Sequence, residues 1–316
     1  MILPSIFQMN KENVSGVANK VMTPTRCVMV VSKELANNLA MMDKIGNRQF
    51  MVQSLINSYG LHKMVRMVPS VKATVEDLRV FHSQDYVEFL TDPRDDEEDQ
   101  YGLGYDCPTH SDLLSWVLGM VGGSLTAATY LVENKAQVAM NWFGGWHHAH
   151  RDRAAGFCYV NDIVISIHKL QTRFQRILYI DLDVHHGDGV EEAFSATDKV
   201  VTFSIHKYEP GFFPGTGAVS DIGTGRGRHY SVNIPLEEGV TDQMYRHIFT
   251  SLFPSIITNF KPDCIVTQCG ADSLSKDPMG GFNLTLDSIT ACVDDVLAIG
   301  SRSRISFQIT KGSTVG

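Results

Sequence analysis

The hydrophobic positions of this chain form two patterns that alternate along its second half. Short unbroken apolar runs occupy residues 137–142, 176–182, 199–205, 229–234 and 264–269. Stretches with apolar residues at helical spacing lie around 159–171, 188–195, 242–258 and 286–298. Short continuous runs are typical of strands that are buried on both faces. The alternation therefore predicts an open parallel α/β sheet covered by helices on both faces.

The first half of the chain is less regular. The β-rich run 27–31 predicts a first strand, and apolar residues at helical spacing predict a helix over 48–59. Residues 75–90 are interrupted by His82-Ser83-Gln84, which indicates two helices. We expect Ser111 to cap a long helix that ends near residue 132.

These elements predict a single domain, because the chain has no internal repeat and no low-complexity linker. A length of 316 residues would by itself also permit two domains. We place the domain at residues 26–298. Residues 1–25 are polar without a clear period and predict a loose N-terminal tail, and residues 299–316 form a separate C-terminal tail.

Composition narrows the class of protein. With 43% hydrophobic and 20% charged residues, the chain has an ordinary globular composition. A formal net charge of −8 argues against direct DNA binding and favours a cationic partner. The six cysteines are scattered without a CxxC pair, so we expect them to be reduced and mostly buried. We recognise no signal peptide and no apolar run near the ~18 residues of a membrane span, and we expect no membrane association.

The strongest chemical signal follows the run 176–182. Asp183 and His185 are two positions apart, so strand geometry points them to the same side. Ionisable groups that converge at the end of a buried strand are costly unless they bind something, and a divalent metal explains them best. Asp272 follows the run 264–269 and reaches the same edge of the sheet. Three oxygen or imidazole ligands with an open position are typical of a catalytic zinc site.

Each of these residues also has an ordinary interpretation. The stretch with Asp183 and His185 could be a surface turn rich in Asp and Gly, although its place after a core strand argues against this. Asp272 alone could equally be a helix N-cap. The set is far more specific than any of its members.

Two adjacent histidines follow the run 137–142. His147 and His148 lie at the same predicted edge, and Asp181 and Asp188 are the carboxylates available to orient them. A carboxylate on one ring nitrogen fixes the tautomer and raises the basicity of the other. A metal-activated water beside a His–Asp base is machinery for hydrolysis.

Long motifs carry these residues, and through them the chain resembles the class I zinc-dependent histone deacetylases. The matching stretches are YGLGYDCP (101–108), NWFGGWHHAHRDRAAGFCYVND (141–162), RILYIDLDVHHGDGVEEAFS (176–195), SIHKYEPGFFPGTG (204–217) and CGADSLSKDPM (269–279). The similarity extends from about residue 27 to about residue 298. It implies an arginase/deacetylase-like single α/β domain, whose parallel sheet is flanked by helices and whose C-terminal part would be missing.

The resemblance also implies the chemistry. The three predicted ligands would bind zinc, or alternatively iron(II) or another divalent metal. His148 would be the general base that activates the zinc-bound water, backed by Asp188, and His147 would be its electrostatic partner, backed by Asp181. The reaction would be hydrolysis of N6-acetyl-lysine with release of acetate.

A substrate tunnel and potassium sites are implied in the same way. Phe157 and Phe213 would wall a narrow tunnel for the acetyl-lysine stem, with Gly156 beside them; ordinary core aromatics are the alternative. Met279 would line the rim, and Asp106 would hold substrate backbone amides. The potassium ligands would be Asp181, Asp183, His185, Ser204 and Ile205 near the zinc, and Phe194, Thr197, Val200 and Tyr230 further out, mostly through backbone oxygens.

The chain departs from the family pattern after about residue 298. There the family continues into a buried strand and a glycine-rich loop whose tyrosine donates a hydrogen bond to the oxyanion, whereas no tyrosine follows Tyr245 here. Loss of one oxyanion donor typically costs about 10²–10³ in rate. Ile305, Phe307 and Ile309 alternate and could form a strand over an exposed sheet edge, but we favour a disordered tail.

Three functions stay open. The first is a working lysine deacetylase, and the second is an impaired or inactive isoform that binds metal, acetyl-lysine or partners without turnover. The third is a relative that hydrolyses other amides such as acetylpolyamines, which Asp106 and Met279 argue against. For the first we expect acetylated histone tails and other acetyl-lysine proteins as partners, no obligatory corepressor, and a location in nucleus and cytoplasm.

Overall fold

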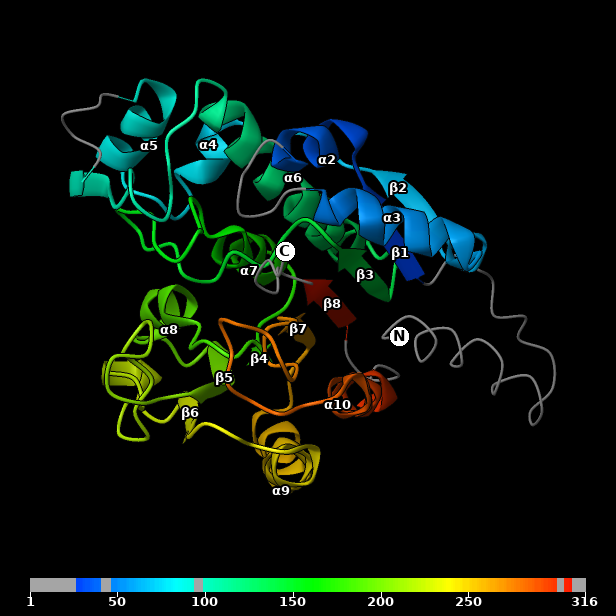
Figure 1. Cartoon of the computed structure of the whole chain (residues 1–316), viewed down its shortest axis with the longest axis vertical. Coiled ribbons are helices and arrows are strands. Elements are labelled where there is room, and N and C mark those ends of the chain that lie inside the picture. Colours follow the sequence, from blue (N-terminus) through cyan, green and yellow to red (C-terminus); the bar gives the residue numbers. More distant parts are fainter. Residues whose placement is uncertain (1–26, 41–46, 94–98, 300–303, 309–316) are drawn as a thin grey trace.

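The computed structural model describes residues 27–40, 47–93, 99–299 and 304–308, which form an α/β domain around one sheet (Figure 1). The strand order is β2-β1-β3-β8-β7-β4-β5-β6, and every pairing is parallel. The strands are β1 (Cys27–Val31), β2 (Arg66–Pro69), β3 (Val138–Asn141), β4 (Ile177–Asp181), β5 (Val200–Lys207), β6 (Ser231–Leu236), β7 (Cys264–Gln268) and β8 (Arg304–Gln308). The predicted fold class is confirmed.

Helices cover both faces of this sheet, as Figure 1 shows. Side chains of α6, α7 and α8 pack on one face, and those of α3, α9 and α10 pack on the other. The helices are α2 (Lys33–Ala40), α3 (Arg48–Ser58), α4 (Val75–Leu78), α5 (Gln84–Thr91), α6 (Leu113–Val132), α7 (Asp162–Gln171), α8 (Asp188–Phe194), α9 (Asp242–Phe260) and α10 (Leu286–Ile299). Short 3-10 turns lie at Leu61–Lys63, Asp99–Tyr101 and Gly225–Gly227.

The unbroken apolar runs form strands because both of their faces are buried. In β4, Leu178 and Ile180 belong to the core under α9 and α10, while Ile177 and Tyr179 belong to the core under α6 and α7. Every residue of β4 is therefore shielded from water, although successive side chains point to opposite faces.

Several local predictions need correction. Ser111 does not cap the long helix: α6 begins at Leu113, with Asp112 at the N-cap position. Helix α2 and strand β2 were not predicted from the sequence, because each is short and has too few apolar residues to set a period. The two helices expected over 75–90 are present as α4 and α5, and Ser83 caps α5 by accepting a hydrogen bond from the backbone N–H of Tyr86.

The C-terminal tail departs most from expectation. Residues 304–308 form β8, which pairs with β3 on one side and β7 on the other. The prediction of a disordered tail is therefore wrong for these residues. The alternative of a strand at an exposed edge is wrong as well, because β8 lies in the middle of the sheet. The predicted N-terminal tail 1–25 and residues 309–316 lie outside the described residues.

Helix α6 is long and apolar enough to cross a membrane by length and composition, which the search for apolar runs did not anticipate. Most of its apolar stretch is buried inside the protein, as expected for the core helix that it forms against α7 and β3. The prediction that the cysteines are mostly buried is confirmed, because all six lie in buried positions, and the structure pairs none of them in a disulfide.

Candidate active site

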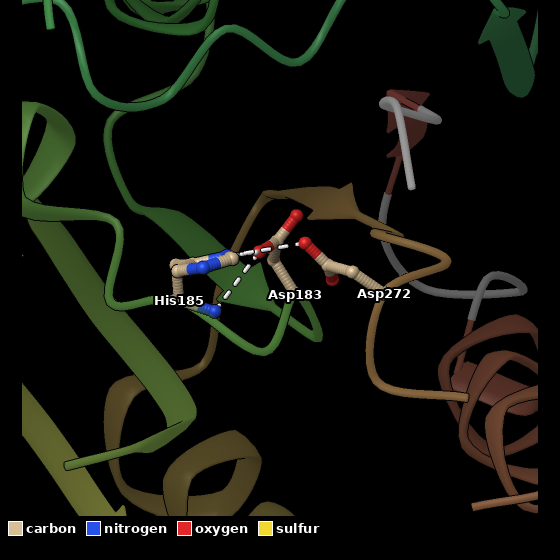
Figure 2. Close-up of side chains that lie close together, drawn as sticks. All are labelled: Asp183, His185 and Asp272. Atoms are coloured by element: carbon tan, nitrogen blue, oxygen red, sulfur yellow. Dashed lines mark hydrogen bonds and ion pairs between the residues drawn. The ribbon is translucent and has the colours of Figure 1, made fainter. Parts of the chain in front are cut away.

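Asp183, His185 and Asp272 meet at the carboxyl edge of the sheet (Figure 2). Asp183 and His185 follow β4, and Asp272 follows its neighbour β7. One ligand atom from each residue lies within 4.8 Å of the others, and all three side chains are buried. His185 Nδ1 is 3.1 Å from Asp183 Oδ1 and 3.1 Å from Asp272 Oδ2, so the ring directs this nitrogen at both carboxylates.

The electrostatics of this group fit a bound cation. Burial, reinforced by the charge of Asp183, raises the pKa of Asp272 to about 7. Two carboxylates this close in a buried place repel each other unless positive charge lies between them. Two carboxylate oxygens and one imidazole nitrogen are also donors that a divalent metal such as zinc accepts, so the residues present fit such an ion.

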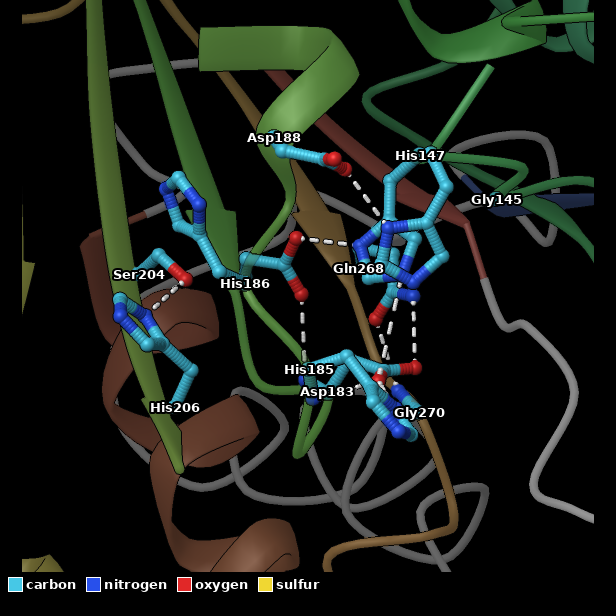
Figure 3. Close-up of polar contacts among 12 residues, drawn as sticks. Gly145, His147, Asp183, His185, His186, Asp188, Ser204, His206, Gln268 and Gly270 are labelled. Carbon is cyan, nitrogen blue, oxygen red and sulfur yellow. Dashed lines mark hydrogen bonds and ion pairs between the residues drawn. The ribbon is translucent and has the colours of Figure 1, made fainter. Parts of the chain in front are cut away.

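His147 lies beside this group on the loop that follows β3, as Figure 3 shows, and His148 is the next residue of that loop. His147 Nδ1 is 2.7 Å from Asp181 Oδ2, and His148 Nδ1 is 2.7 Å from Asp188 Oδ1. The two ring centroids are 3.9 Å apart. Both rings thus use Nδ1 for a buried carboxylate, which leaves Nε2 of each ring for other partners.

The two histidines have opposite pKa shifts. Burial would lower the pKa of His147, but the carboxylates of Asp181 and Asp183 outweigh it and raise the value to about 9. Burial and the charge of His147 lower the pKa of His148 to about 4, against the opposing effect of Asp188. These shifts favour a protonated His147 and a neutral His148 that is able to accept a proton.

The loop that carries these histidines is held by the start of α7. Asn161 caps α7, since its Oδ1 accepts a hydrogen bond from the backbone N–H of Val164 at 3.1 Å. The Nδ2 atom of Asn161 donates to the carbonyl oxygens of His147 at 3.2 Å and Ala149 at 2.9 Å. One side chain thereby ties a helix terminus to the backbone on both sides of His148.

The carboxylate of Asp162 holds the same loop just before His147. It accepts hydrogen bonds from the backbone N–H groups of Gly145 at 3.0 Å and Trp146 at 2.8 Å, and from the Ser124 hydroxyl. Burial raises the pKa of Asp162 to about 6 despite these donors. The sequence analysis quoted Asn161 and Asp162 within a motif but gave neither residue a role, because a contact with loop backbone leaves no signature in residue spacing.

A cavity of about 270 Å³ opens onto the histidines and the metal-ligand group. It is lined by Asp106, Gly145, Trp146, His147, His148, Gly156, Phe157, Cys158, Asp183, His185, Phe213, Asp272 and Met279. The structure therefore brings every residue predicted for the substrate tunnel to the same cavity as the predicted catalytic histidines and metal ligands. Met279 and Phe213 lie at its mouth and are each 42% exposed.

Gly156 lines the cavity where His148 and Phe213 come close to it. A Cβ atom at this position would lie 2.6 Å from His148 Cδ2 and 2.9 Å from Phe213 Cε1, closer than real Cβ contacts. Its φ of +52° is also in the left-handed region that favours glycine. The backbone N–H of Gly156 donates to Asp106 Oδ2 at 3.0 Å, so Asp106 braces this wall from the rim.

The residues predicted to bind potassium form two separate groups. Ser204 and Ile205 are in β5, where Ser204 pairs with Asp181 of β4. The more distant set gathers around the end of α8: Phe194 is its last residue, the backbone N–H of Thr197 donates to the carbonyl of Phe194 at 3.1 Å, and Val200 begins β5. Tyr230 directly precedes β6, and its carbonyl accepts a hydrogen bond from Thr202 of β5. Potassium binding itself stays a prediction.

Comparison with known proteins agrees with this architecture. The histone deacetylase domain family matches residues 43–310, a range that extends through β8. The chain is 47% identical to histone deacetylase 8 of Xenopus tropicalis over 270 residues, which cover 84% of this chain and 73% of the relative. It is 46% identical to histone deacetylase 8 of Danio rerio over 276 residues, 85% of this chain and 73% of the relative. It is 44% identical to human histone deacetylase 1 over 253 residues, 78% of this chain and 52% of the relative.

Proposed function

Because the chain belongs to the class I histone deacetylase family, we propose that it is a metal-dependent hydrolase that removes the acetyl group from N6-acetyl-lysine in histones and other proteins. One observation carries the proposal. A group of three metal-ligating side chains and two His–Asp pairs of opposite pKa shift lie together at one cavity. The metal-ligand group alone would also fit a metal-storage site, and the His–Asp pairs alone would not indicate hydrolysis.

The cavity wall selects a long apolar stem with a polar end. Phe157 and Phe213 line the cavity with aromatic rings that can pack against the four methylenes of an acetyl-lysine side chain, and the absence of a Cβ at Gly156 leaves room beside His148 and Phe213. At the mouth, Asp106 presents a carboxylate that is able to accept hydrogen bonds from a peptide backbone. This pairing favours acetylated proteins over acetylated polyamines, which have no peptide N–H groups.

Asp183, His185 and Asp272 would hold a divalent metal, which we propose to be zinc or alternatively iron(II). When bound, this metal would supply Lewis acidity to the acetyl carbonyl and to the attacking water.

Proton transfer falls to His148. Its neutral ring accepts a proton from the attacking water at Nε2, and the carboxylate of Asp188 at 2.7 Å stabilises the imidazolium that results. The same proton then passes to the lysine nitrogen as the C–N bond breaks, which gives acetic acid and the lysine amine, and transfer of the acid proton to the amine leaves acetate and a lysine ammonium group. His147 keeps its positive charge beside the reacting atoms and stabilises the negative charge that develops on the acetyl oxygen.

One observation favours a second function, binding of acetyl-lysine with impaired or absent turnover. Within the described part of the chain, the residues that line the cavity include no tyrosine, and no tyrosine occurs at positions 246–316. An active site whose oxyanion relies on His147 and the metal alone would turn over more slowly by about 10²–10³.

The test is turnover of a fluorogenic acetyl-lysine peptide by the purified chain loaded with zinc or with iron(II). We expect acetate release above the level of a His148→Ala blank that binds the same amount of metal. Turnover equal to this blank, with a cooperative melt and one bound metal, would reject the hydrolase and support the binder. Addition of a corepressor fragment should leave the rate unchanged.

The partners that we propose are acetylated histone tails and other acetyl-lysine proteins, met in the nucleus and cytoplasm. Potassium at the two predicted sites is part of the same proposal. Its test is a melting curve in potassium chloride compared with one in tetramethylammonium chloride at equal ionic strength, where potassium should raise the melting temperature.

A further inference from the structure

The two carboxylates behind the histidines have different surroundings. Asp181 accepts from the hydroxyl of Tyr179 at 2.6 Å and from the backbone N–H of Asp183 at 3.1 Å, in addition to His147. Asp188 instead divides its two oxygens between two histidines. Its Oδ1 is 2.7 Å from His148 Nδ1, and its Oδ2 is 3.4 Å from His150 Nε2.

His150 is in turn held by a second carboxylate. Its Nδ1 contacts Glu192, which lies four residues after Asp188 on the same face of α8. An ionised carboxylate only accepts hydrogen bonds, so the position of the His150 ring between two carboxylates favours its doubly protonated, cationic form. A raised pKa of His150 agrees with this, since its contacts with Asp188 and Glu192 outweigh the effect of burial.

These contacts form a continuous path from the cavity to solvent. His148 lines the cavity, Asp188 and His150 are each 8% exposed, and the side chain of Glu192 is 62% exposed. A carboxylate that is bound on one side only can rotate about its Cβ–Cγ bond. A cation that holds the second oxygen of Asp188 removes this freedom and keeps Oδ1 directed at His148.

From this geometry we propose that His150 is a positioning residue: anchored by Glu192, it fixes the carboxylate of Asp188 against the Nδ1 of His148. It acts on the reaction only through Asp188, because His150 is not among the residues that line the cavity. No role was predicted for His150 from the sequence, where it is simply the third histidine of the run His147-His148-Ala149-His150.

The first test does not depend on turnover. In a chain with 15N-labelled histidine rings, the proton on His148 Nδ1 should give a downfield resonance that is absent from the His148→Gln variant. In His150→Leu this resonance should move upfield or disappear through exchange with water. His150→Gln, which retains a donor toward Asp188, should preserve it, as should the control His247→Leu, where an exposed histidine is replaced.

An unchanged resonance in a folded His150→Leu variant would overturn the proposal. If that variant does not fold, Glu192→Ala decides the question at an exposed position: the resonance should shift in the same direction, and an unchanged resonance would again overturn the proposal.

The second test rests on the proposed function. His150→Leu should lower kcat about tenfold with KM unchanged, the lower end of the loss seen when a carboxylate–histidine support is removed, and His150→Gln should restore most of it. A lower kcat in both His150→Leu and His150→Gln, or in neither variant, would contradict positioning through a hydrogen bond. Absence of turnover in the unmodified chain would reject the proposed function alone, because the resonance still reports on His150.

Discussion

Substitution of Gly156 by alanine is the sharpest probe of the cavity wall, because the structure fixes what the added methyl group meets. The new Cβ would lie 2.6 Å from His148 Cδ2 and 2.9 Å from two ring atoms of Phe213. Ordinary contact begins near 3.4 Å, so the His148 ring has to move by at least about 0.8 Å. Movement of the Phe213 ring alone cannot relieve both close contacts, because this ring packs edge-on against the His148 ring, with centroids 4.8 Å apart.

The magnitude follows from two separable effects. The first effect is backbone strain, because a non-glycine residue in the left-handed region costs about 1–2 kcal/mol of stability. Displacement of a catalytic group by about 1 Å can cost about 100-fold in rate, or about 3 kcal/mol of barrier. Gly225 isolates the first effect: its φ is +51°, against +52° at Gly156, and a methyl group at Gly225 would meet no atom within 4 Å.

The assay compares Gly156→Ala and Gly225→Ala with the unmodified chain in thermal melts and in acetyl-lysine turnover. Both variants should lose a similar amount of stability from backbone strain. Only Gly156→Ala should also lose about 100-fold in kcat. If Gly156→Ala turns over within threefold of Gly225→Ala, the ring of His148 does not need the position that the structure gives it, and our account of the proton transfer is wrong.

Three further predictions concern the metal, a buried carboxylate and the sheet. Asp183→Asn should retain much less than one equivalent of zinc by mass spectrometry after dialysis, whereas Asp198→Asn, which replaces a carboxylate that pairs with Arg226 at the surface, should retain it; equal zinc content would refute the ligand assignment. Because burial raises the pKa of Asp162 to about 6, against about 3.9 unfolded, its carboxylate weakens the fold above pH 6, and this penalty is lost as the pH falls below about 4. Asp162→Asn should therefore destabilise the protein less at about pH 7.5 than at about pH 4.5, by roughly 2 kcal/mol in urea titrations, and a pH-independent difference would contradict this. Ser306→Pro removes an N–H from the middle of β8, which is paired on both sides, and should lower the free energy of unfolding by about 3 kcal/mol or more; an unchanged melt would show that β8 contributes little.

The parts of the site that follow from chain geometry were predictable from the sequence. Residues that follow neighbouring parallel strands meet at one edge, so Asp183 and Asp272 could be placed together from the hydrophobic runs alone. The structure brings these side chains together with His185, and it places each catalytic histidine against the carboxylate that the resemblance implied. Their functional roles are the part that only the proposed experiments test.

Other features depend on contacts that no local pattern encodes. Asp162 and Asn161 bind the backbone of a loop that precedes them by about 15 residues, and His150 reaches Glu192 some 40 residues away. The central position of β8 is a further case, because its backbone pairing with β3 and β7 joins segments that are distant in sequence. Alternation in residues 305–309 showed that a strand was feasible, but only tertiary pairing determines where it lies.

Asp181 and Asp188 have different surroundings, and the adjacent histidines that they contact have opposite pKa shifts. Asp181 is closed in by Tyr179 and the backbone, so its charge acts mainly on His147 and helps to keep that ring protonated near pH 7. Asp188 contacts a second histidine, His150, while burial and the positive charge of His147 oppose protonation of His148. A pair of titratable groups whose environments separate their pKa values is the arrangement that general acid–base chemistry requires. In the proposed mechanism the neutral ring would accept a proton while the charged ring beside it stabilises the oxyanion, and burial, the carboxylates and the charge of His147 together separate the two pKa values.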